Sequence, residues 1–498
     1  MALIQITDLT FTYPGSFDPV FEHVSFQLDT DWRLGLTGRN GRGKTTLLRL
    51  LQGQYPHQGT ITAPGGFEYF PYPIPDAALT PLELLECSFP DVPQWRLRRE
   101  LAPLFVTDDA LYRPFSTLSG GEQAKILLAL LFAREGRYLL IDEPTNHLDE
   151  TGRALVSRYL AKKSGFLLVS HDRAFLDGCV DHILSINRGG IEVQKGNFSS
   201  WYENRQRRDA FELAQNAQLK KEIGRLKQAA RQSRAWADKV ESTKIGPHSA
   251  KVTGEADAMG GRAYIGEQSR RMQQRRKNLE RRQNAAIEEK SALLKNIEQA
   301  APLKLHQLPY HTDRLALLRD VSVCYGGAPV CRGVSFCVEQ GDRIALRGAN
   351  GTGKTSLLRL LCGEDVPHTG TVERSSRLRI SYVRQDPSGL RGDLGAYAAR
   401  YGLDESLFKA ILRKLDFARV QFEKDMADFS AGQKKKVLLA RSLCEPSHLL
   451  VWDEPLNYVD VLSRMQIEDL LLEFQPTIVF VEHDRVFCDR VATKAVTL

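Results

Sequence analysis

Hydrophobic and polar residues alternate at two places in the chain, LIQITDLTFTY (3–13) and RLALLRDVSVCY (314–325), and this period of two predicts β-strands. Four other stretches are uninterrupted apolar runs of strand length: LLI (139–141), FLLV (166–169), LLVW (449–452) and IVFV (478–481). Such runs, interleaved with helical segments, are typical of parallel strands that are covered on both faces. The pattern therefore predicts an α/β fold.

Four segments of the first half recur in the second half at a nearly constant distance along the chain. GRNGRGKTTLLRLLQG (38–53) recurs as GANGTGKTSLLRLLCG (348–363). LSGGEQAKILLALLFAR (118–134) recurs as FSAGQKKKVLLARSLCE (429–445), YLLIDEPTNHLD (138–149) as LLVWDEPLNYVD (449–460), and VSHD (169–172) as VEHD (481–484). The repeat predicts two homologous domains, at 1–200 and 303–498, joined by a segment at 201–302.

The joining segment has the pattern of a long helical hairpin. It contains no proline and only one glycine between residues 199 and 245, and neither residue type between 267 and 301. The interval between these arms is rich in glycine and small residues, which predicts a tip at about 243–266. The predicted fold class is α/β, with two tandem domains joined by a long α-helical hairpin.

The basic character of the chain is concentrated in this hairpin. Residues 201–300 contain 22 Lys or Arg and 13 Asp or Glu, a net charge of +9, whereas the whole chain carries +7. The hairpin is therefore a candidate for binding RNA phosphates, although a solvated coiled-coil face is the alternative. The basic residues of its densest run are Arg270, Arg271, Arg275, Arg276, Lys277, Arg281 and Arg282.

The motif G-x-x-x-x-G-K-[ST], at 38–45 and 348–355, stands each time between a predicted strand and a predicted helix. In that setting the glycines let backbone N–H groups turn toward phosphate oxygens, and the helix adds its positive N-terminal end. Lys44 and Lys354 are expected to reach the β and γ phosphates, and Thr45 and Thr355 to offer a hydroxyl to Mg²⁺. The motif predicts two nucleoside triphosphate sites.

Acidic residues and histidines at the ends of apolar runs complete each predicted site. A carboxylate at the end of a strand can help to hold Mg²⁺, and a second carboxylate can polarise the attacking water as general base. A histidine after the next strand can contact the γ-phosphate. The candidates are Asp142 and Asp453 for Mg²⁺, Glu143 and Glu454 for the general base, and His171 and His483 for the γ-phosphate.

Together these motifs resemble the ATP-binding cassette family. LSGGEQ (118–123) resembles the signature of that family, and SAGQKK (430–435) resembles a drifted copy. The resemblance implies that the signature of one cassette closes over the nucleotide held by the glycine loop of the other, so that two ATP molecules lie between the halves of a monomer. It also implies adenine stacking by Tyr13 and Tyr325, for which the sequence alone leaves a core position open. The expected ATP contacts are Tyr13, Gly38, Arg39, Asn40, Gly41, Arg42, Gly43, Lys44, Thr45, Thr46, Ser119, Gly120, Gly121, Glu122, Tyr325, Gly348, Ala349, Asn350, Gly351, Thr352, Gly353, Lys354, Thr355, Ser356, Ser430, Ala431, Gly432 and Gln433.

The chain also departs from the family pattern. Ala431 stands where the signature has glycine, and Tyr72 stands in the first cassette where the family has a glutamine that binds the metal. Gln385 keeps that glutamine in the second cassette and is expected to bind Mg²⁺. The second cassette has Leu456, Tyr458 and Val459 where the first has Thr145, His147 and Leu148. Both glutamates are present, so both sites are expected to act, at rates that need not be equal.

A pair of cassettes with a basic hairpin between them resembles the ABC-F proteins, and the segments 233–246 and 285–298 are similar to the linker of the Lsa and Vga resistance branch. That resemblance implies an ATPase that binds the ribosomal exit-tRNA site, near 23S rRNA and the peptidyl-site tRNA. It also implies protection against lincosamide, pleuromutilin and streptogramin A drugs. Val252, Met259 and Tyr264 are then the expected tip residues.

The apolar runs, the N-terminal sequence and the cysteines bear on where the protein acts and on its metal or redox chemistry. The longest apolar run, Ile126–Ala133, is too short to span a bilayer, and the N-terminal sequence has no secretion signal, so a cytoplasmic location is expected. The eight cysteines form no CxxC pair, and we assign them no metal or redox role. Two alternatives stay open: a housekeeping translation factor without a drug phenotype, and an ATPase subunit of a membrane transporter.

Overall fold

The computed structural model describes residues 2–15, 18–146, 148–187, 190–244, 274, 278, 281–282, 285, 303, 305, 307–325, 328–349, 351–417 and 419–498. The chain divides into two compact units. One consists of Met1–Trp201 with Ala300–Leu498 and contains both cassettes, and the other is Tyr202–Gln299.

The first cassette begins with a three-stranded antiparallel sheet of order β2-β1-β4 (β1 Leu3–Phe11, β2 Phe21–Asp29, β4 Gln58–Thr62). The predicted alternation of β1 is confirmed, because Ile4 and Ile6 are buried. A register shift around Asp8, whose φ is +55°, moves the alternation by one residue, so that Leu9 and Phe11 are buried next.

The larger sheet of the first cassette has the order β5-β6-β7-β3-β8-β9, and every neighbouring pair is parallel except β8 and β9. Its strands are β3 (Arg33–Thr37), β5 (Phe67–Phe70), β6 (Tyr138–Asp142), β7 (Phe166–Val169), β8 (His182–Asn187) and β9 (Gly190–Lys195). The apolar run at β7 is buried along its whole length, which confirms the predicted covered parallel strand.

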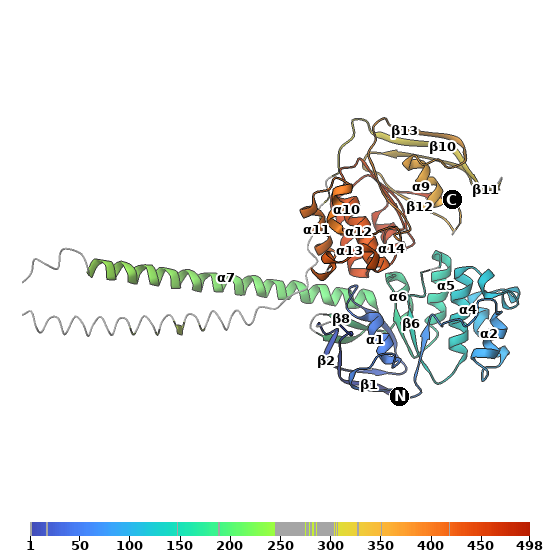
Figure 1. Cartoon of the computed structure of the whole chain (residues 1–498), viewed down its shortest axis with the longest axis horizontal. Helices are drawn as coiled ribbons and strands as arrows, with labels where there is room; N and C mark the ends of the chain where they lie inside the picture. Colours follow the sequence, from blue (N-terminus) through green and yellow to red (C-terminus); the bar gives the residue numbers. More distant parts are fainter. Residues whose placement is uncertain are drawn as a thin grey trace, which may run out of the picture. The chain divides into compact units, whose positions relative to one another are not determined.

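The second cassette repeats this plan. Its antiparallel sheet has the order β11-β10-β13 and its parallel sheet the order β14-β15-β16-β12-β17. The strands are β10 (Arg314–Tyr325), β11 (Ala328–Glu339), β12 (Arg343–Arg347), β13 (His368–Arg374), β14 (Ile380–Val383), β15 (Leu449–Asp453), β16 (Ile478–Val481) and β17 (Lys494–Thr497). In Figure 1 the antiparallel sheet lies at one end of this cassette and the helices α10 to α13 at the other.

The helices follow the strands in matching order. In the first cassette they are α1 (Lys44–Leu51), α2 (Pro81–Ser88), α3 (Gln94–Leu101), α4 (Gly120–Ala133), α5 (Glu150–Leu160) and α6 (Arg173–Cys179). In the second they are α9 (Lys354–Cys362), α10 (Leu394–Arg400), α11 (Glu405–Lys414), α12 (Ala431–Cys444), α13 (Val461–Phe474) and α14 (Arg485–Val491). Short 3-10 turns lie at η1 (Ala102–Leu104), η2 (Asp108–Leu111), η3 (Phe115–Thr117), η5 (Arg419–Glu423) and η6 (Met426–Asp428).

Polar motif residues begin several of these helices. Ser119 caps α4 and Ser430 caps α12, each in a capping box with the residue three positions later. Asp149 and Asp460 cap α5 and α13 in the same manner, each accepting a backbone N–H bond. The signature serines therefore stand at helix N-termini, where unpaired N–H groups and the helix dipole favour an anion.

The long helix α7 (Phe198–Lys244) provides most of the described residues of the second unit (Figure 1). Its 47 residues correspond to a length of about 70 Å at 1.5 Å per residue. This helix is the predicted first arm. The predicted return arm lies mostly outside the described residues, although residues 281 and 282 are helical and exposed. In the described part of the chain, no helix is both long and apolar enough to cross a membrane.

Candidate functional site

Each glycine loop connects a central parallel strand to a helix, β3 to α1 in the first cassette and β12 to α9 in the second. Gly43 has a φ of +90°, and a Cβ there would lie 2.6 Å from a methyl carbon of Val20, so only glycine fits. Gly353 at the equivalent position has a φ of +85°. Each loop therefore ends in a left-handed glycine at the N-terminus of a helix, a position that suits a phosphate.

The loop lysines point back over their own loops. The ammonium of Lys44 donates to the Gly38 carbonyl at 2.7 Å, and that of Lys354 donates to the Gly348 and Ala349 carbonyls at 2.7 and 2.8 Å. Burial lowers the pKa of both lysines below its usual value. An ammonium has three donors and can be shared between these carbonyls and a phosphate oxygen, so the position fits the proposed role.

Oxygen ligands for a cation lie beside each loop. In the first cassette, Thr45 Oγ1 lies 3.3 Å from Asp142 Oδ2. In the second, both carboxylate oxygens of Asp453 are buried without a hydrogen-bond partner among the described residues, and burial raises the pKa of Asp453 to about 6. Hydroxyl and carboxylate oxygens are the ligands that Mg²⁺ prefers, so these residues fit a bound Mg²⁺.

The two candidate bases have similar backbones but different surroundings. Glu143 and Glu454 both adopt left-handed backbone conformations, with φ of +51° and +46°. Glu454 contacts three side-chain nitrogens: Gln385 Nε2 at 2.9 Å, Asn457 Nδ2 at 2.6 Å and His483 Nε2 at 3.3 Å. Glu143 Oε1 lies 3.2 Å from His171 Nε2. The second glutamate is therefore held by more donors.

These surroundings shift the pKa values of the two carboxyls in opposite directions. Burial raises the pKa of Glu143 to about 8, and the nearby charge of Asp142 adds to the rise. Burial also acts to raise the pKa of Glu454, but the contacts with His483 and Gln385 outweigh it and hold that pKa below its usual value. Burial therefore favours the protonated form of Glu143, whereas the contacts of Glu454 favour its ionised form, which can accept a proton.

A cleft of about 840 Å³ joins the glycine loop of the second cassette to the signature of the first. Its lining includes Ser119, Gly120, Gly121, Glu122, Tyr325, Ala349, Gly351, Thr352, Gly353, Lys354, Thr355, Ser356, Gln385, Glu454 and His483. We name it the second nucleotide cleft. The residues expected around the second ATP molecule thus share one cleft with room for a nucleotide.

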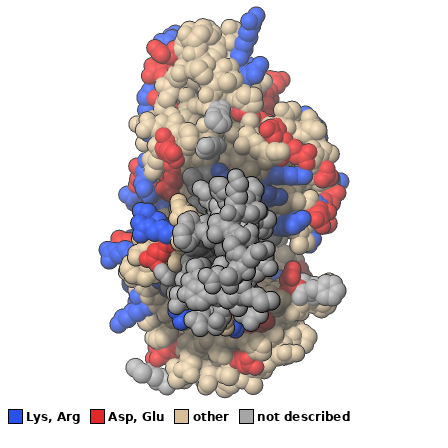
Figure 2. Space-filling model, turned by 90° about the vertical axis from the view of Figure 1, so that its left-hand side faces the viewer, with Lys and Arg blue, Asp and Glu red and all other residues tan. Residues whose placement is uncertain are grey.

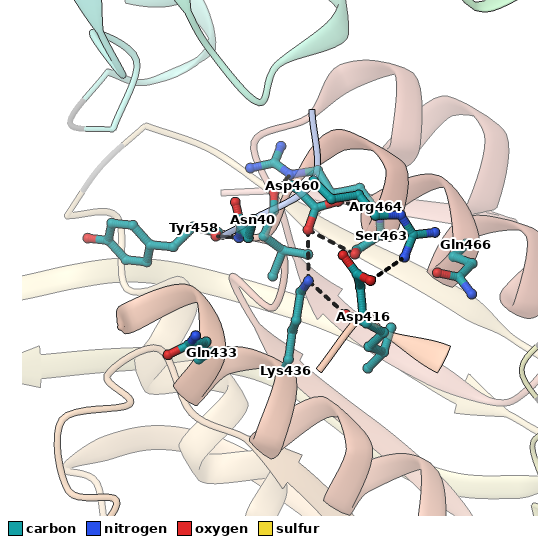
Figure 3. Close-up of polar contacts among 12 residues, drawn as sticks. Asn40, Asp416, Gln433, Lys436, Tyr458, Asp460, Ser463, Arg464 and Gln466 are labelled. Atoms are coloured by element: carbon teal, nitrogen blue, oxygen red, sulfur yellow. Dashed lines mark hydrogen bonds and ion pairs between the residues drawn. The ribbon is translucent and has the colours of Figure 1, made fainter. Parts of the chain in front are cut away.

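The first glycine loop makes direct contacts with the second cassette. Asn40 Nδ2 donates to the Tyr458 carbonyl at 2.9 Å, and a Cβ on Gly432 would lie 2.9 Å from Asn40 Nδ2 (Figure 3). Arg39 and Arg42 lie 3.7 and 3.9 Å from the same carboxylate oxygen, Asp416 Oδ1. The second cassette has Ala349 and Thr352 where these arginines stand, so the two glycine loops have different polar partners.

The candidate adenine-stacking tyrosines are not core residues. Tyr13 is 38% and Tyr325 44% exposed. The Tyr13 hydroxyl lies 2.7 Å from Thr46 Oγ1, and the Tyr325 hydroxyl 3.1 Å from Ser356 Oγ, so each ring is tied to the helix that follows its glycine loop. The Tyr13 ring also packs edge-to-face against Phe11 and Tyr55, with centroids 5.0 and 5.8 Å apart. Adenine stacking by Tyr13 and Tyr325 stays a prediction.

Some predicted residues cannot be placed. Asn350, His147, the tip residues Val252, Met259 and Tyr264, and the linker residues Arg270, Arg271, Arg275, Arg276 and Lys277 lie outside the described residues. Arg281 and Arg282 are exposed on a helix, as an RNA contact requires. Their binding to RNA stays a prediction.

The sequence did not reveal a tyrosine at the first metal site. The Tyr69 hydroxyl donates to Asp142 Oδ2 at 2.9 Å, whereas Tyr72, at the position of the missing glutamine, packs its ring 5.0 Å from that of Phe89. The available signal was that both cassettes have tyrosine at this strand position, Tyr69 in β5 and Tyr382 in β14.

Replacing Tyr69 by phenylalanine is therefore expected to weaken Mg²⁺-dependent ATP binding at the first site by about 10-fold, because groups that orient a metal ligand usually matter by that amount. Fluorescent ATP titrated against Mg²⁺ in a Lys354→Ala background measures this site alone. Tyr382→Phe in a Lys44→Ala background is the matched control at the other site. An unchanged Mg²⁺ requirement in the Tyr69 variant would show that its hydroxyl does not support Asp142.

Comparisons with known proteins agree with this geometry. The family described as "ABC transporter" matches residues 21–68 and 331–457, which include both glycine loops. The chain is 26% identical over 495 residues to "Ribosome protection protein VmlR" of Bacillus subtilis (strain 168), an alignment that covers 98% of this chain and 85% of VmlR. It is 29% identical over 500 residues to "ATP-binding protein Uup" of Caulobacter vibrioides, with 96% of this chain and 75% of that protein covered.

Among solved structures, the complex of the archaeal ribosomal stalk protein aP1 with the ribosome recycling factor aABCE1 gives a TM-score of 0.62 at 17% identity. The match covers 98% of this chain and 87% of that chain, and at this identity it bears on the fold alone. The predicted fold, two tandem P-loop ATP-binding cassettes, is confirmed.

Proposed function

We propose that this chain is an ATP-binding protein of the ABC-F family, a cytoplasmic ATPase that binds ribosomes with ATP bound and leaves them after hydrolysis. The observation that carries the proposal is the combination of two nucleotide sites with a linker of net charge +9 in one chain. Similarity over nearly the whole chain to a protein named for ribosome protection supports it.

The described residues fit hydrolysis in the second nucleotide cleft. The loop backbone and Lys354 would hold the phosphates, and the signature of the first cassette would close over them. Thr355, Gln385 and Asp453 would hold Mg²⁺, which neutralises phosphate charge when bound. Glu454, ionised and fixed by its three neighbours, would orient and deprotonate the attacking water, while His483 contacts the γ-phosphate.

The linker is the proposed RNA-binding element. The cassettes and short flanks outside residues 201–300 carry a net charge near zero, and basic and acidic side chains are interspersed on the described face in Figure 2. The excess positive charge therefore belongs to the linker, where arginine forks suit phosphate oxygens. We propose 23S rRNA and the peptidyl-site tRNA in the exit-tRNA region as its contacts.

Protection against lincosamide, pleuromutilin and streptogramin A drugs is the finer part of the proposal. The name of VmlR, a ribosome protection protein, supports a protective role, while a translation factor without a drug phenotype fits the cassettes and linker equally well. Expression in a susceptible bacterium separates the two. A rise of about fourfold or more in the inhibitory concentration of these drugs supports protection, and unchanged susceptibility at confirmed expression supports the housekeeping role.

The double variant Glu143→Gln, Glu454→Gln is expected to stay with ribosomes when ATP is present, because ATP binding is kept while hydrolysis and release are blocked. Sedimentation through a sucrose cushion at moderate salt measures the bound fraction. The variant Lys44→Ala, Lys354→Ala, which should not close around ATP, is the matched control. Recovery of the glutamate double variant free of ribosomes would refute ATP-dependent binding.

A further inference from the structure

A fully buried lysine, Lys435, lies next to the backbone that carries Gln385 and Glu454 of the second site. Lys435 is on α12, five residues after the cap Ser430, and none of its side chain is exposed. Its ammonium donates to the carbonyl oxygens of Arg384 at 2.8 Å and Asp453 at 3.3 Å. These residues immediately precede Gln385 and Glu454, so one ammonium holds the backbone of both segments.

The fold does not itself require this lysine. The first cassette has Ala124 at the equivalent position of α4 and builds the same strand and helix arrangement. A buried ammonium is costly to desolvate. Two neutral carbonyls accept hydrogen bonds from Lys435, and the nearby charges of Glu482 and Asp453 offset part of the cost. A costly group that the homologous cassette lacks indicates a role at the second site.

The helix that carries Lys435 also contacts the first site. Gly432 on α12 lies against Asn40 of the first glycine loop. The next lysine, Lys436, bonds to Asp460 and to the Leu415 carbonyl, both at 2.8 Å (Figure 3). Asp416 follows Leu415 and faces Arg39 of the first loop. The first turns of α12 are therefore attached to the first site on one side and, through Lys435, to the second site on the other.

We propose that Lys435 is a positioning residue that transmits closure of the first nucleotide site to Gln385 and Glu454 of the second. The inference rests on the proposed ATPase activity. A helix turn moves as a rigid element, so a shift of α12 toward nucleotide in the first loop displaces the ammonium and the two carbonyls bonded to it. Gln385 Nε2 lies 2.9 Å from Glu454 Oε2, so these two side chains then change position together.

The test uses the full-length Glu143→Gln protein as parent, so that hydrolysis reports the second site while the first site still binds ATP. In this parent, adding Lys44→Ala removes ATP from the first site and is expected to lower kcat by about 10-fold or more. Adding Lys435→Met to the parent is expected to lower kcat while changing KM for ATP by less than about threefold. Adding Lys44→Ala to that Lys435→Met protein is then expected to change kcat by less than about twofold. Lys434→Met, at the neighbouring and partly exposed lysine, is the matched control and should keep the full effect of Lys44→Ala.

The outcomes separate this inference from the proposed function. If the Lys435→Met protein hydrolyses ATP and still responds fully to Lys44→Ala, the inference is wrong and the ATPase assignment stands. If the wild-type protein does not hydrolyse ATP, the ATPase assignment fails and the inference fails with it. If the wild-type protein hydrolyses ATP and the Glu143→Gln parent does not, turnover depends on the first site and only the inference is wrong. If Lys435→Met does not fold by thermal unfolding and gel filtration, Lys435→Gln, which keeps N–H donors, replaces it. Full response to Lys44→Ala in a folded Lys435→Gln protein with impaired kcat contradicts coupling, and loss of the response supports it.

Discussion

Replacing Glu454 by glutamine is expected to lower the rate of ATP hydrolysis by about 10²–10³-fold, the range in which a positioned general base acts. The same change at Glu143 is expected to cost less than about 10-fold. The reason is the different environment of the two carboxyls. Glu454 is held by Gln385, Asn457 and His483, and these contacts favour its ionised form, whereas burial favours the protonated form of Glu143.

Phosphate release at saturating ATP and Mg²⁺, measured on each single variant, checks this asymmetry. ATP binding to each variant, followed with a fluorescent analogue, is the control, because glutamine keeps the shape of the side chain and should keep the affinity. Equal losses in the two variants, or a larger loss at Glu143, would contradict the assignment of turnover to the second cleft.

Neutralising the linker is expected to have the largest effect on ribosome binding. Replacement of Arg270, Arg271, Arg275, Arg276, Arg281 and Arg282 by glutamine should weaken binding about 10³–10⁴-fold near 0.15 M salt. It should also reduce the slope of log affinity against log salt by roughly 4–5, or about 0.7–0.9 for each lost phosphate contact. The physical reason is that each arginine releases condensed counterions from RNA.

Binding to purified ribosomes at several salt concentrations measures the affinity and the slope of log affinity against log salt. The control is a variant of the same arm with Glu280, Glu288 and Glu289 changed to glutamine, which removes acidic charge and should not weaken binding. ATP hydrolysis without ribosomes should be the same in both proteins. A linker variant that keeps its affinity and its salt slope would show that the arginines form only a solvated face.

The features that the sequence predicted are those encoded locally. The glycine loops, the aspartates that end β6 and β15, and the serines that begin α4 and α12 follow from spacing and from the repeat. These local rules apply whatever the surrounding residues are.

The features that the sequence did not reveal depend on contacts between distant segments. Tyr69 reaches Asp142 across adjacent strands, Asp416 faces Arg39 from the other cassette, and Lys435 bonds to carbonyls rather than to side chains. Every residue has a backbone carbonyl, so the sequence does not show which carbonyls accept from Lys435. Its hydrogen bonds could therefore not be predicted from composition or spacing. Its one available signal was the contrast with Ala124 in the repeat.

In the proposed cycle, closure around ATP controls contact between the basic linker and the ribosome. Co-sedimentation of the wild-type chain with ribosomes in ATP, a non-hydrolysable ATP analogue, ADP or no nucleotide tests this dependence. We expect the protein in the ribosomal pellet with the analogue, a smaller fraction with ATP, and little with ADP or without nucleotide. A bound fraction that is the same in all four conditions would contradict it.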